Sequence, residues 1–224
     1  MALNITAIIV AAGRGTRMGA DKNKVFLNLL GKTILENTVS VFQGCEKITD
    51  ITVVTNDLQE CKKLLSGFSK VGAIVLGGET RQESVKNGIL ASSGDFAVIH
   101  DGARALIREE EINAAIDSAI EFGAAALGVK SKDTLKLADK DGFIKETVDR
   151  EFIYNIQTPQ VFKYDEIKNM LKNAPHNNFT DDCALAESFG VRIKIVDGSY
   201  DNIKITTKDD LEIAEKILKK RGEK

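Results

Sequence analysis

Short apolar runs alternate with longer amphipathic segments along most of this 224-residue chain. Runs rich in β-branched residues and bounded by glycine or polar residues predict buried strands, and apolar positions at helical spacing predict helices. Strands are predicted at 5–10, 51–54, 73–76, 96–100, 123–129 and 191–196, and helices at 34–42, 57–65, 82–90, 109–122, 164–171, 180–189 and 208–218. This alternation favours an α/β fold with a doubly wound, mostly parallel sheet and helices on both faces.

The alternation breaks between residues 131 and 160. Two extended stretches, 134–137 and 144–148, flank Asp141-Gly142, and Asp-Gly is a strong signal for a hairpin turn. A two-stranded hairpin alone is marginal in water, so we expect it to pack against another surface, most economically a second subunit. The length suits one α/β domain. We therefore predict a single domain over 1–224 with a protruding β-hairpin dimerisation arm at about 131–160.

A loop of small and basic residues follows the first predicted strand. Its segment 11–19 is Ala-Ala-Gly-Arg-Gly-Thr-Arg-Met-Gly, and Lys22 and Lys24 lie just beyond it. In an open α/β sheet, ligands bind at the carboxyl ends of the strands. Small residues let backbone N–H groups approach phosphate oxygens, and the arginines and lysines add positive charge. The loop therefore predicts a polyphosphate site, and the alternative is a glycine-rich turn with solvated charges.

The loop matches neither of the common phosphate-binding motifs. Its third glycine comes one residue late for the dinucleotide fingerprint, and two basic residues lie inside it. Gly31-Lys32-Thr33 resembles the end of a P-loop, but Phe26 stands where that motif needs a glycine. The loop alone therefore leaves open both a polyphosphate site of another kind and a glycine-rich turn with solvated charges.

Composition and charge narrow the class of protein. The net charge of −2 argues against a general nucleic-acid binder, and no apolar run approaches the ~20 residues of a membrane helix. The N-terminus enters a strand without a basic segment, so we expect no signal peptide. The three cysteines are far apart and form no CxxC pair, which suits reduced thiols in a cytoplasmic protein, and two histidines give little support for a zinc site.

Polar residues end several other predicted strands, in segments 77–81, 100–104 and 201–204. These strand ends are expected to converge on the site, which would place Asp101 and Asp201 near the basic loop. A pair of aspartates beside a triphosphate suits Mg²⁺, which takes few protein carboxylates and keeps phosphate oxygens and water as ligands. The alternative, that both aspartates are turn residues, stays open, above all for Asp201 in the polar segment 198–202.

The chain resembles the 2-C-methyl-D-erythritol 4-phosphate cytidylyltransferases of isoprenoid biosynthesis. The ordered motifs that carry the resemblance are 11–19 with 24–26, 77–85, 100–104, 133–136, 157–160, 180–182 and 201–206. The resemblance implies a Rossmann-like nucleotidyltransferase fold and transfer of CMP from CTP to 2-C-methyl-D-erythritol 4-phosphate, with release of pyrophosphate. It also implies Mg²⁺ as cofactor and a homodimer in which the arm of one subunit reaches the site of the other.

The resemblance also assigns roles to residues of this chain. Arg17 and Lys24 would be the catalytic cations. The residues implied for nucleotide binding are Ala11, Ala12, Gly13, Gly15, Gly78, Glu79, Arg81, Ser84, Gly102 and Lys204. Those implied for the phosphorylated polyol are Asp101, Arg104, Thr134, Arg150, Thr158 and Lys204, with Asp101 and Asp201 as candidates for the metal.

The chain departs from the family pattern near two motifs. The family often has proline and glutamine around its loop lysine, where this chain has Asn23 and Val25, and often has Ala-Ala-Arg-Pro where this chain has Gly102-Ala103-Arg104-Ala105. The charged residues are retained. Ribitol 5-phosphate cytidylyltransferase is the alternative within enzymes, and a catalytically silent nucleotide-binding module is the alternative outside them.

The implied chemistry suits these residues. A substrate phosphate oxygen that attacks the α-phosphorus of CTP is already anionic, so neither an enzyme nucleophile nor a strong general base is needed. In-line positioning and charge neutralisation are needed instead, and Arg17, Lys24 and Mg²⁺ can supply them. His100 is the tempting base, but its place at a strand end favours a role in orienting its neighbours.

Overall fold

The computed structural model describes residues 3–13, 23–176 and 178–222. Its centre is a seven-stranded sheet of order β11-β7-β10-β6-β1-β4-β5. The strands are β1 (Ile5–Ala11), β4 (Asp50–Thr55), β5 (Val71–Leu76), β6 (Phe96–Asp101), β7 (Ala124–Lys130), β10 (Tyr154–Lys163) and β11 (Lys194–Asp197). Only β10 runs antiparallel to its sheet neighbours, β6 and β7, so the predicted mostly parallel α/β sheet is confirmed.

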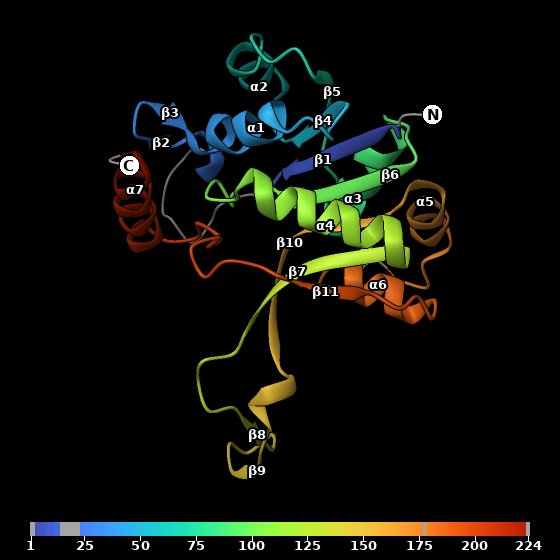
Figure 1. The fold of residues 1–224 in the computed structure, drawn as a ribbon, viewed down its shortest axis with the longest axis vertical. Helices are drawn as coiled ribbons and strands as arrows, with labels where there is room; N and C mark the ends of the chain where they lie inside the picture. Colours follow the sequence, from blue (N-terminus) through green and yellow to red (C-terminus); the bar gives the residue numbers. More distant parts are fainter. Residues whose placement is uncertain (1–2, 14–22, 177, 223–224) are drawn as a thin grey trace.

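Seven α-helices surround the sheet in the part of the chain that the structure describes (Figure 1). They are α1 (Ile34–Gly44), α2 (Leu58–Leu64), α3 (Arg81–Leu90), α4 (Glu109–Phe122), α5 (Tyr164–Asn173), α6 (Asp182–Ser188) and α7 (Lys208–Gly222). Each of them overlaps a helix that the apolar spacing predicts, with ends that shift by a few residues.

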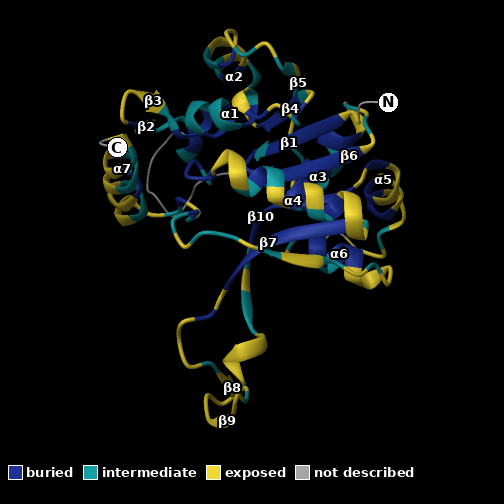
Figure 2. Cartoon of the chain, viewed as in Figure 1, coloured by how far each residue is buried: buried dark blue, intermediate teal, exposed yellow. Residues whose placement is uncertain are grey.

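Alternation along the strands gives the sheet two apolar faces. In β1, Ala7 and Ile9 pack with buried residues of α1 and α4, whereas Ile8 packs with α3 and α5. Successive side chains of a strand point to opposite faces, so one apolar run serves both cores. Figure 2 shows these central strands as almost wholly buried. The strands β1 and β6 pair in register, from Ile5 opposite Phe96 to Val10 opposite Asp101. Their carboxyl ends are therefore held rigidly beside each other.

Strand β10 is the main element that the pattern of apolar residues does not predict. It contains Gln157-Thr158-Pro159-Gln160, and proline cannot donate to a sheet ladder. The pairing with β7 shifts register between Ile156 and Gln160, and this irregularity accommodates the proline in the middle of the sheet. Residues 154–160 of the predicted excursion thus return into the central sheet.

A small hairpin replaces the P-loop ending that Gly31-Lys32-Thr33 resembles. Strands β2 (Asn28–Leu29) and β3 (Lys32–Thr33) are joined by Leu30 and Gly31, both with positive φ of 54° and 87°. Thr33 then caps α1 in a reciprocal capping box with Glu36. This hairpin packs with α7 in a third apolar cluster, so the motif is structural.

A second hairpin extends from the body of the molecule as an arm (Figure 1). Its strands are β8 (Lys136–Ala138) and β9 (Ile144–Thr147), followed by the short 3-10 helix η3 (Arg150–Phe152). Phe143, Ile144 and Phe152 are 72%, 66% and 75% exposed, which is unusual for such large apolar side chains.

Among the described residues, none of the helices combines the length and apolarity that crossing a bilayer requires.

Candidate active site

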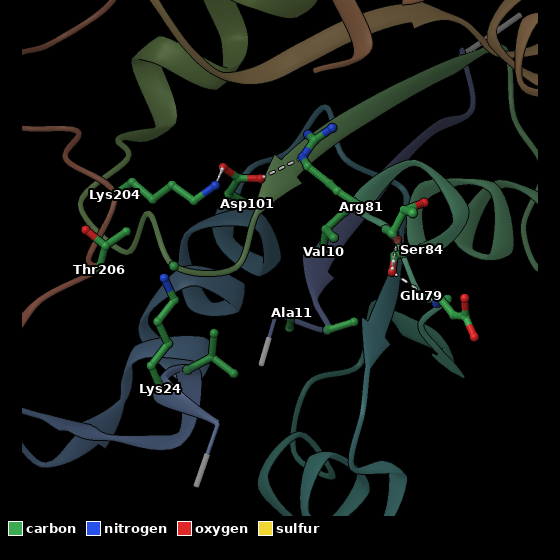
Figure 3. Close-up of a pocket in the computed structure, with 15 residues that line it drawn as sticks. Val10, Ala11, Lys24, Glu79, Arg81, Ser84, Asp101, Lys204 and Thr206 are labelled. Carbon is green, nitrogen blue, oxygen red and sulfur yellow. Dashed lines mark hydrogen bonds and ion pairs between the residues drawn. The ribbon is translucent and has the colours of Figure 1, made fainter. Parts of the chain in front are cut away.

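A pocket of about 330 Å³ lies at the carboxyl ends of β1 and β6 (Figure 3). The predicted site residues that line it are Ala11, Ala12, Gly13, Lys24, Gly78, Glu79, Arg81, Ser84, Asp101 and Lys204. A neighbouring cavity of about 250 Å³ shares Arg81, Asp101 and Lys204 with it and is also lined by Arg104 and Thr158. The structure therefore brings most of the predicted nucleotide and substrate residues into two adjoining spaces.

Asp101 is the centre of charge in this region. Its side chain is 9% exposed and binds Lys204 Nζ at 2.7 Å, Arg81 Nε at 3.3 Å and Arg104 Nε at 3.8 Å. Burial alone would raise the pKa of Asp101, but the nearby Arg81, Lys204 and Arg104 lower it well below its ordinary value. Asp101 is thus ionised and surrounded by cations that also face the pockets.

Asp182, to which the sequence analysis assigns no role, is a second buried carboxylate in this network. Asp182, at the start of α6, is 2% exposed and accepts a hydrogen bond from Arg81 Nη2 at 2.8 Å. Burial raises the pKa of Asp182 and Arg81 partly offsets that shift. Arg81 therefore bridges two carboxylates, Asp101 and Asp182. The sequence signal was the Thr180-Asp181-Asp182 run before an apolar helix, which suggests a helix start more readily than a partner for a distant arginine.

His100 is a structural residue of this site rather than its base. It is fully buried, and burial lowers its pKa to about 4, so the ring is neutral at pH 7. Nε2 lies 3.2 Å from the Arg104 carbonyl oxygen, which can only accept, so Nε2 carries the proton. Nδ1 then accepts from the Thr158 hydroxyl at 3.1 Å, and that hydroxyl accepts from the Asp101 N–H at 3.1 Å. The chain of hydrogen bonds fixes the end of β6.

The segment from Gly77 to Ser84 is closely packed and internally hydrogen-bonded. Ser84 Oγ donates to the Thr80 carbonyl at 2.9 Å and accepts from the Gly78 N–H at 3.1 Å. A Cβ at Gly77 would lie 2.3 Å from the Ala12 Cβ, so only glycine fits between β5 and the opening loop. Because a hydroxyl has one donor and two acceptor positions, Ser84 can offer a ligand only its remaining acceptor position.

The loop that carries Lys204 is anchored on both sides. Asn202 is fully buried, and its Nδ2 donates to the Thr158 carbonyl at 3.0 Å and to Gln157 Oε1 at 3.3 Å. Arg104 Nη1 donates to the Asn202 carbonyl at 2.7 Å, and the Ile205 N–H donates to the Ala103 carbonyl at 2.9 Å. Lys204 therefore reaches Asp101 from a rigid segment.

The two predicted metal carboxylates have different surroundings. Asp201 accepts from Arg108 and Arg221, each at 3.3 Å, and its side chain is 42% exposed. The described residues contain no group of three or more His, Cys, Asp or Glu side chains placed to hold a metal ion. Of these two aspartates, Asp101 lines the pocket together with the predicted phosphate-binding residues, and Asp201 does not. That arrangement fits Mg²⁺ only if phosphate oxygens and water supply most of its ligands.

The other predicted site residues either fall outside the described part of the chain or line neither cavity. Gly15 and Arg17 fall outside the described residues. Thr134 and Arg150 are exposed on the arm and line neither of the two pockets, and Arg150 Nη1 donates to the Lys132 carbonyl at 2.9 Å. Gly102 follows β6, where a Cβ would lie 3.2 Å from the Val10 carbonyl oxygen, so it allows close packing of the two strand ends.

Comparisons with known proteins agree over nearly the whole chain. Residues 5–220 match the family model described as "IspD: 2-C-methyl-D-erythritol 4-phosphate cytidylyltransferase". The protein of that name from Clostridium novyi (strain NT) is 46% identical over 220 residues, with 95% of both chains covered. Its namesake from Caldanaerobacter subterraneus subsp. tengcongensis is 45% identical over 227 residues, which cover 97% of this chain and 100% of the relative.

A solved structure is similar as well. The crystal structure of 4-diphosphocytidyl-2C-methyl-D-erythritol synthase from Anaerococcus prevotii DSM 20548 has a TM-score of 0.86 to this chain and 33% sequence identity, with 96% of both chains covered.

The charge network makes a prediction about pH and stability. Asp101→Asn removes the buried anion that binds Lys204 and Arg104, and one of the two that bind Arg81, so we expect the free energy of unfolding at pH 7 to fall by about 3–5 kcal/mol. The folded-state pKa of Asp101 is lowered, so its stabilisation is present above the ordinary value of 3.8 and is lost as the pH falls below it. Urea denaturation at pH 7 and at lower pH measures this.

The control is Asp201→Asn, whose exposed pairs with Arg108 and Arg221 are worth about 0–1 kcal/mol each. An Asp101→Asn protein as stable as the wild type at pH 7, or a difference that does not shrink on acidification, would contradict the assigned network.

Proposed function

The chain belongs to the 2-C-methyl-D-erythritol 4-phosphate cytidylyltransferase family, and from that premise we propose that it transfers CMP from CTP to 2-C-methyl-D-erythritol 4-phosphate and releases pyrophosphate. The observation that carries the proposal is the pair of adjoining cavities that share Arg81, Asp101 and Lys204. CTP occupies the larger cavity, beside Ala11–Gly13 and Lys24. The acceptor occupies the smaller one, beside Arg104 and Thr158.

The reaction needs charge and geometry more than a reactive side chain. A phosphate oxygen of the acceptor forms a bond to the α-phosphorus of CTP, and the bond from that phosphorus to the bridging oxygen of pyrophosphate breaks. Lys24 and Arg17 neutralise the charge that grows on the phosphates and the leaving group. Among the described residues, no cysteine or histidine lines either cavity, and His100 is buried and neutral, which suits a reaction without an enzyme nucleophile.

Mg²⁺ is proposed as the cofactor of this reaction. Bound mainly by phosphate oxygens, it would neutralise charge on the triphosphate, and Asp101 is the protein carboxylate that could join its ligands. Asp201, which binds Arg108 and Arg221, is better suited to holding the Lys204 loop in place.

The arm supports a homodimer with shared sites. Its large apolar residues are exposed in the single chain, and a two-stranded hairpin gains stability by packing against another surface. Arg150 and Thr134 lie on this arm, away from both cavities of their own chain. In a dimer they would complete the acceptor site of the partner.

A cytoplasmic location is proposed with this biosynthetic role.

The first test is turnover. We expect pyrophosphate release with CTP and 2-C-methyl-D-erythritol 4-phosphate, and far less with ribitol 5-phosphate. Lys24→Ala and Arg17→Ala should each lower kcat roughly 10²–10³-fold, the usual effect of losing one electrostatic stabiliser. Equal use of both acceptors, or near-normal kcat in both variants, would contradict the proposal.

The second test concerns the base. Ser84 can only accept a further hydrogen bond, so it matches the amino group of cytosine and not the carbonyl of uracil. We expect CTP to be preferred over UTP, and both over ATP and GTP, since an unmatched base leaves buried polar groups unpaired.

Ser84→Ala should reduce the CTP-to-UTP preference in kcat/KM by about tenfold. Ser92→Ala is the control, because Ser92, just beyond the end of α3, also donates to a helix carbonyl, that of Gly88 at 2.8 Å, but does not line the pocket. An unchanged preference in Ser84→Ala would refute the role of the hydroxyl.

The third test concerns assembly. Arg150→Ala damages the site that the arm reaches, whereas Lys24→Ala damages the site of its own chain. A mixed dimer of the two variants would contain one intact site and one with both lesions. After proven subunit exchange we expect up to about half the activity of a wild-type dimer per heterodimer. No recovery would place Arg150 in its own subunit's site or outside any site.

A further inference from the structure

Two side-chain amides bind the backbone carbonyls where β1 meets the nucleotide pocket. Asn23 Nδ2 donates to the Ala11 carbonyl at 2.8 Å, and Asn56 Nδ2 donates to the Ala12 carbonyl. Both alanines line the larger cavity. A carbonyl oxygen carries partial negative charge, so an unpaired one beside a triphosphate would be unfavourable. The hydrogen bonds from the two amides satisfy these carbonyl oxygens.

Asn23 also shapes the turn that carries Lys24. Its Oδ1 accepts from the Val25 N–H at 3.4 Å, which caps the 3-10 helix η2 (Lys24–Phe26). Its own carbonyl accepts from the Phe26 N–H at 3.0 Å, and Val25 is 2% exposed. Lys24 therefore lies between a residue tied to β1 and a residue fixed in the core.

This arrangement limits the conformational freedom of Lys24, which would otherwise reduce its effect as an electrostatic catalyst. Its long side chain has about 2 kcal/mol of rotamer entropy, so the position of its backbone determines how often the ammonium meets the phosphate. A displacement of about 1 Å of a group that positions substrate can cost about 10²-fold in rate. Lys24 lines the cavity together with Ala11, and Asn23 joins the backbones of both.

We propose that Asn23 is a positioning residue of the transferase reaction, whose amide ties the turn bearing Lys24 to the carboxyl end of β1. The inference rests on the proposed function for its kinetic consequences, but the tie itself is a property of the chain without substrate. It also gives Asn23, a departure from the family pattern, a role of its own.

Two substitutions separate the two hydrogen bonds. Asn23→Ala removes both the donor to Ala11 and the acceptor for the Val25 N–H. Asn23→Asp keeps an acceptor for the Val25 N–H but cannot donate, and it places a charge beside the Ala11 carbonyl. The control is Asn37→Ala, because Asn37 Nδ2 also donates to strand and turn carbonyls, those of Leu29 at 3.1 Å and Thr33 at 2.9 Å, without lining the pocket.

We expect kcat to fall about tenfold or more in Asn23→Ala, and at least as far in Asn23→Asp, because Lys24 is misplaced in the transition state. In Asn23→Ala, which adds no charge, the Kd of CTP measured without acceptor should change by less than about threefold, since the remaining pocket still binds the ground state. Asn37→Ala should keep kcat while it lowers the melting temperature. Wild-type kcat in either Asn23 variant would overturn the proposal, as would equal kcat losses in Asn23→Ala and Asn37→Ala.

A second measurement does not depend on turnover. Hydrogen exchange of the Val25, Phe26 and Leu27 amides in the substrate-free protein should speed up in Asn23→Ala and stay unchanged in Asn37→Ala. Unchanged exchange in Asn23→Ala would overturn the tie. Absent turnover of CTP by the wild-type protein would instead refute the proposed function, and the exchange result would still decide whether Asn23 holds the turn.

Discussion

A single buried carboxylate, Asp101, organises the positive charge on which the rest of the site depends. The site needs cations to hold phosphates, yet three cations within 4 Å of one point repel one another strongly when water is scarce. Asp101 ends β6 and binds Lys204, Arg81 and Arg104, which come from different parts of the chain. The anion lets these cations gather before any ligand arrives, so the site is assembled in advance.

The surrounding structure serves to keep that anion and its cations in place. The Asp101 N–H is held by Thr158, which is held in turn by neutral His100, and Arg81 is held from behind by Asp182. Asn202 fixes the loop of Lys204, as Asn23 fixes the turn of Lys24. The proposed catalysis by positioning and charge requires such rigidity, because in that mechanism no covalent intermediate holds the reactants in line.

The sequence predicted much of this arrangement for a clear physical reason. Parallel strands end at one edge of the sheet, so the polar residues after β1, β5 and β6 had to meet there. The sequence could not show which charges pair. Asp201, predicted to lie with Asp101 at a metal, binds Arg108 and Arg221, and Asp182 is distant in sequence from the arginine it serves. Strand β10 escaped prediction because its polar, proline-containing segment enters the sheet through an irregular register.

We propose that charge and geometry carry the reaction, with no nucleophile supplied by the chain. The most direct test of this proposal is the stereochemical course at the α-phosphorus, followed with a CTP analogue that is chiral there through a sulfur substituent. A single in-line attack by the acceptor phosphate predicts inversion of configuration. Retention would require two displacements and a covalent nucleotidyl-enzyme, and would contradict the account.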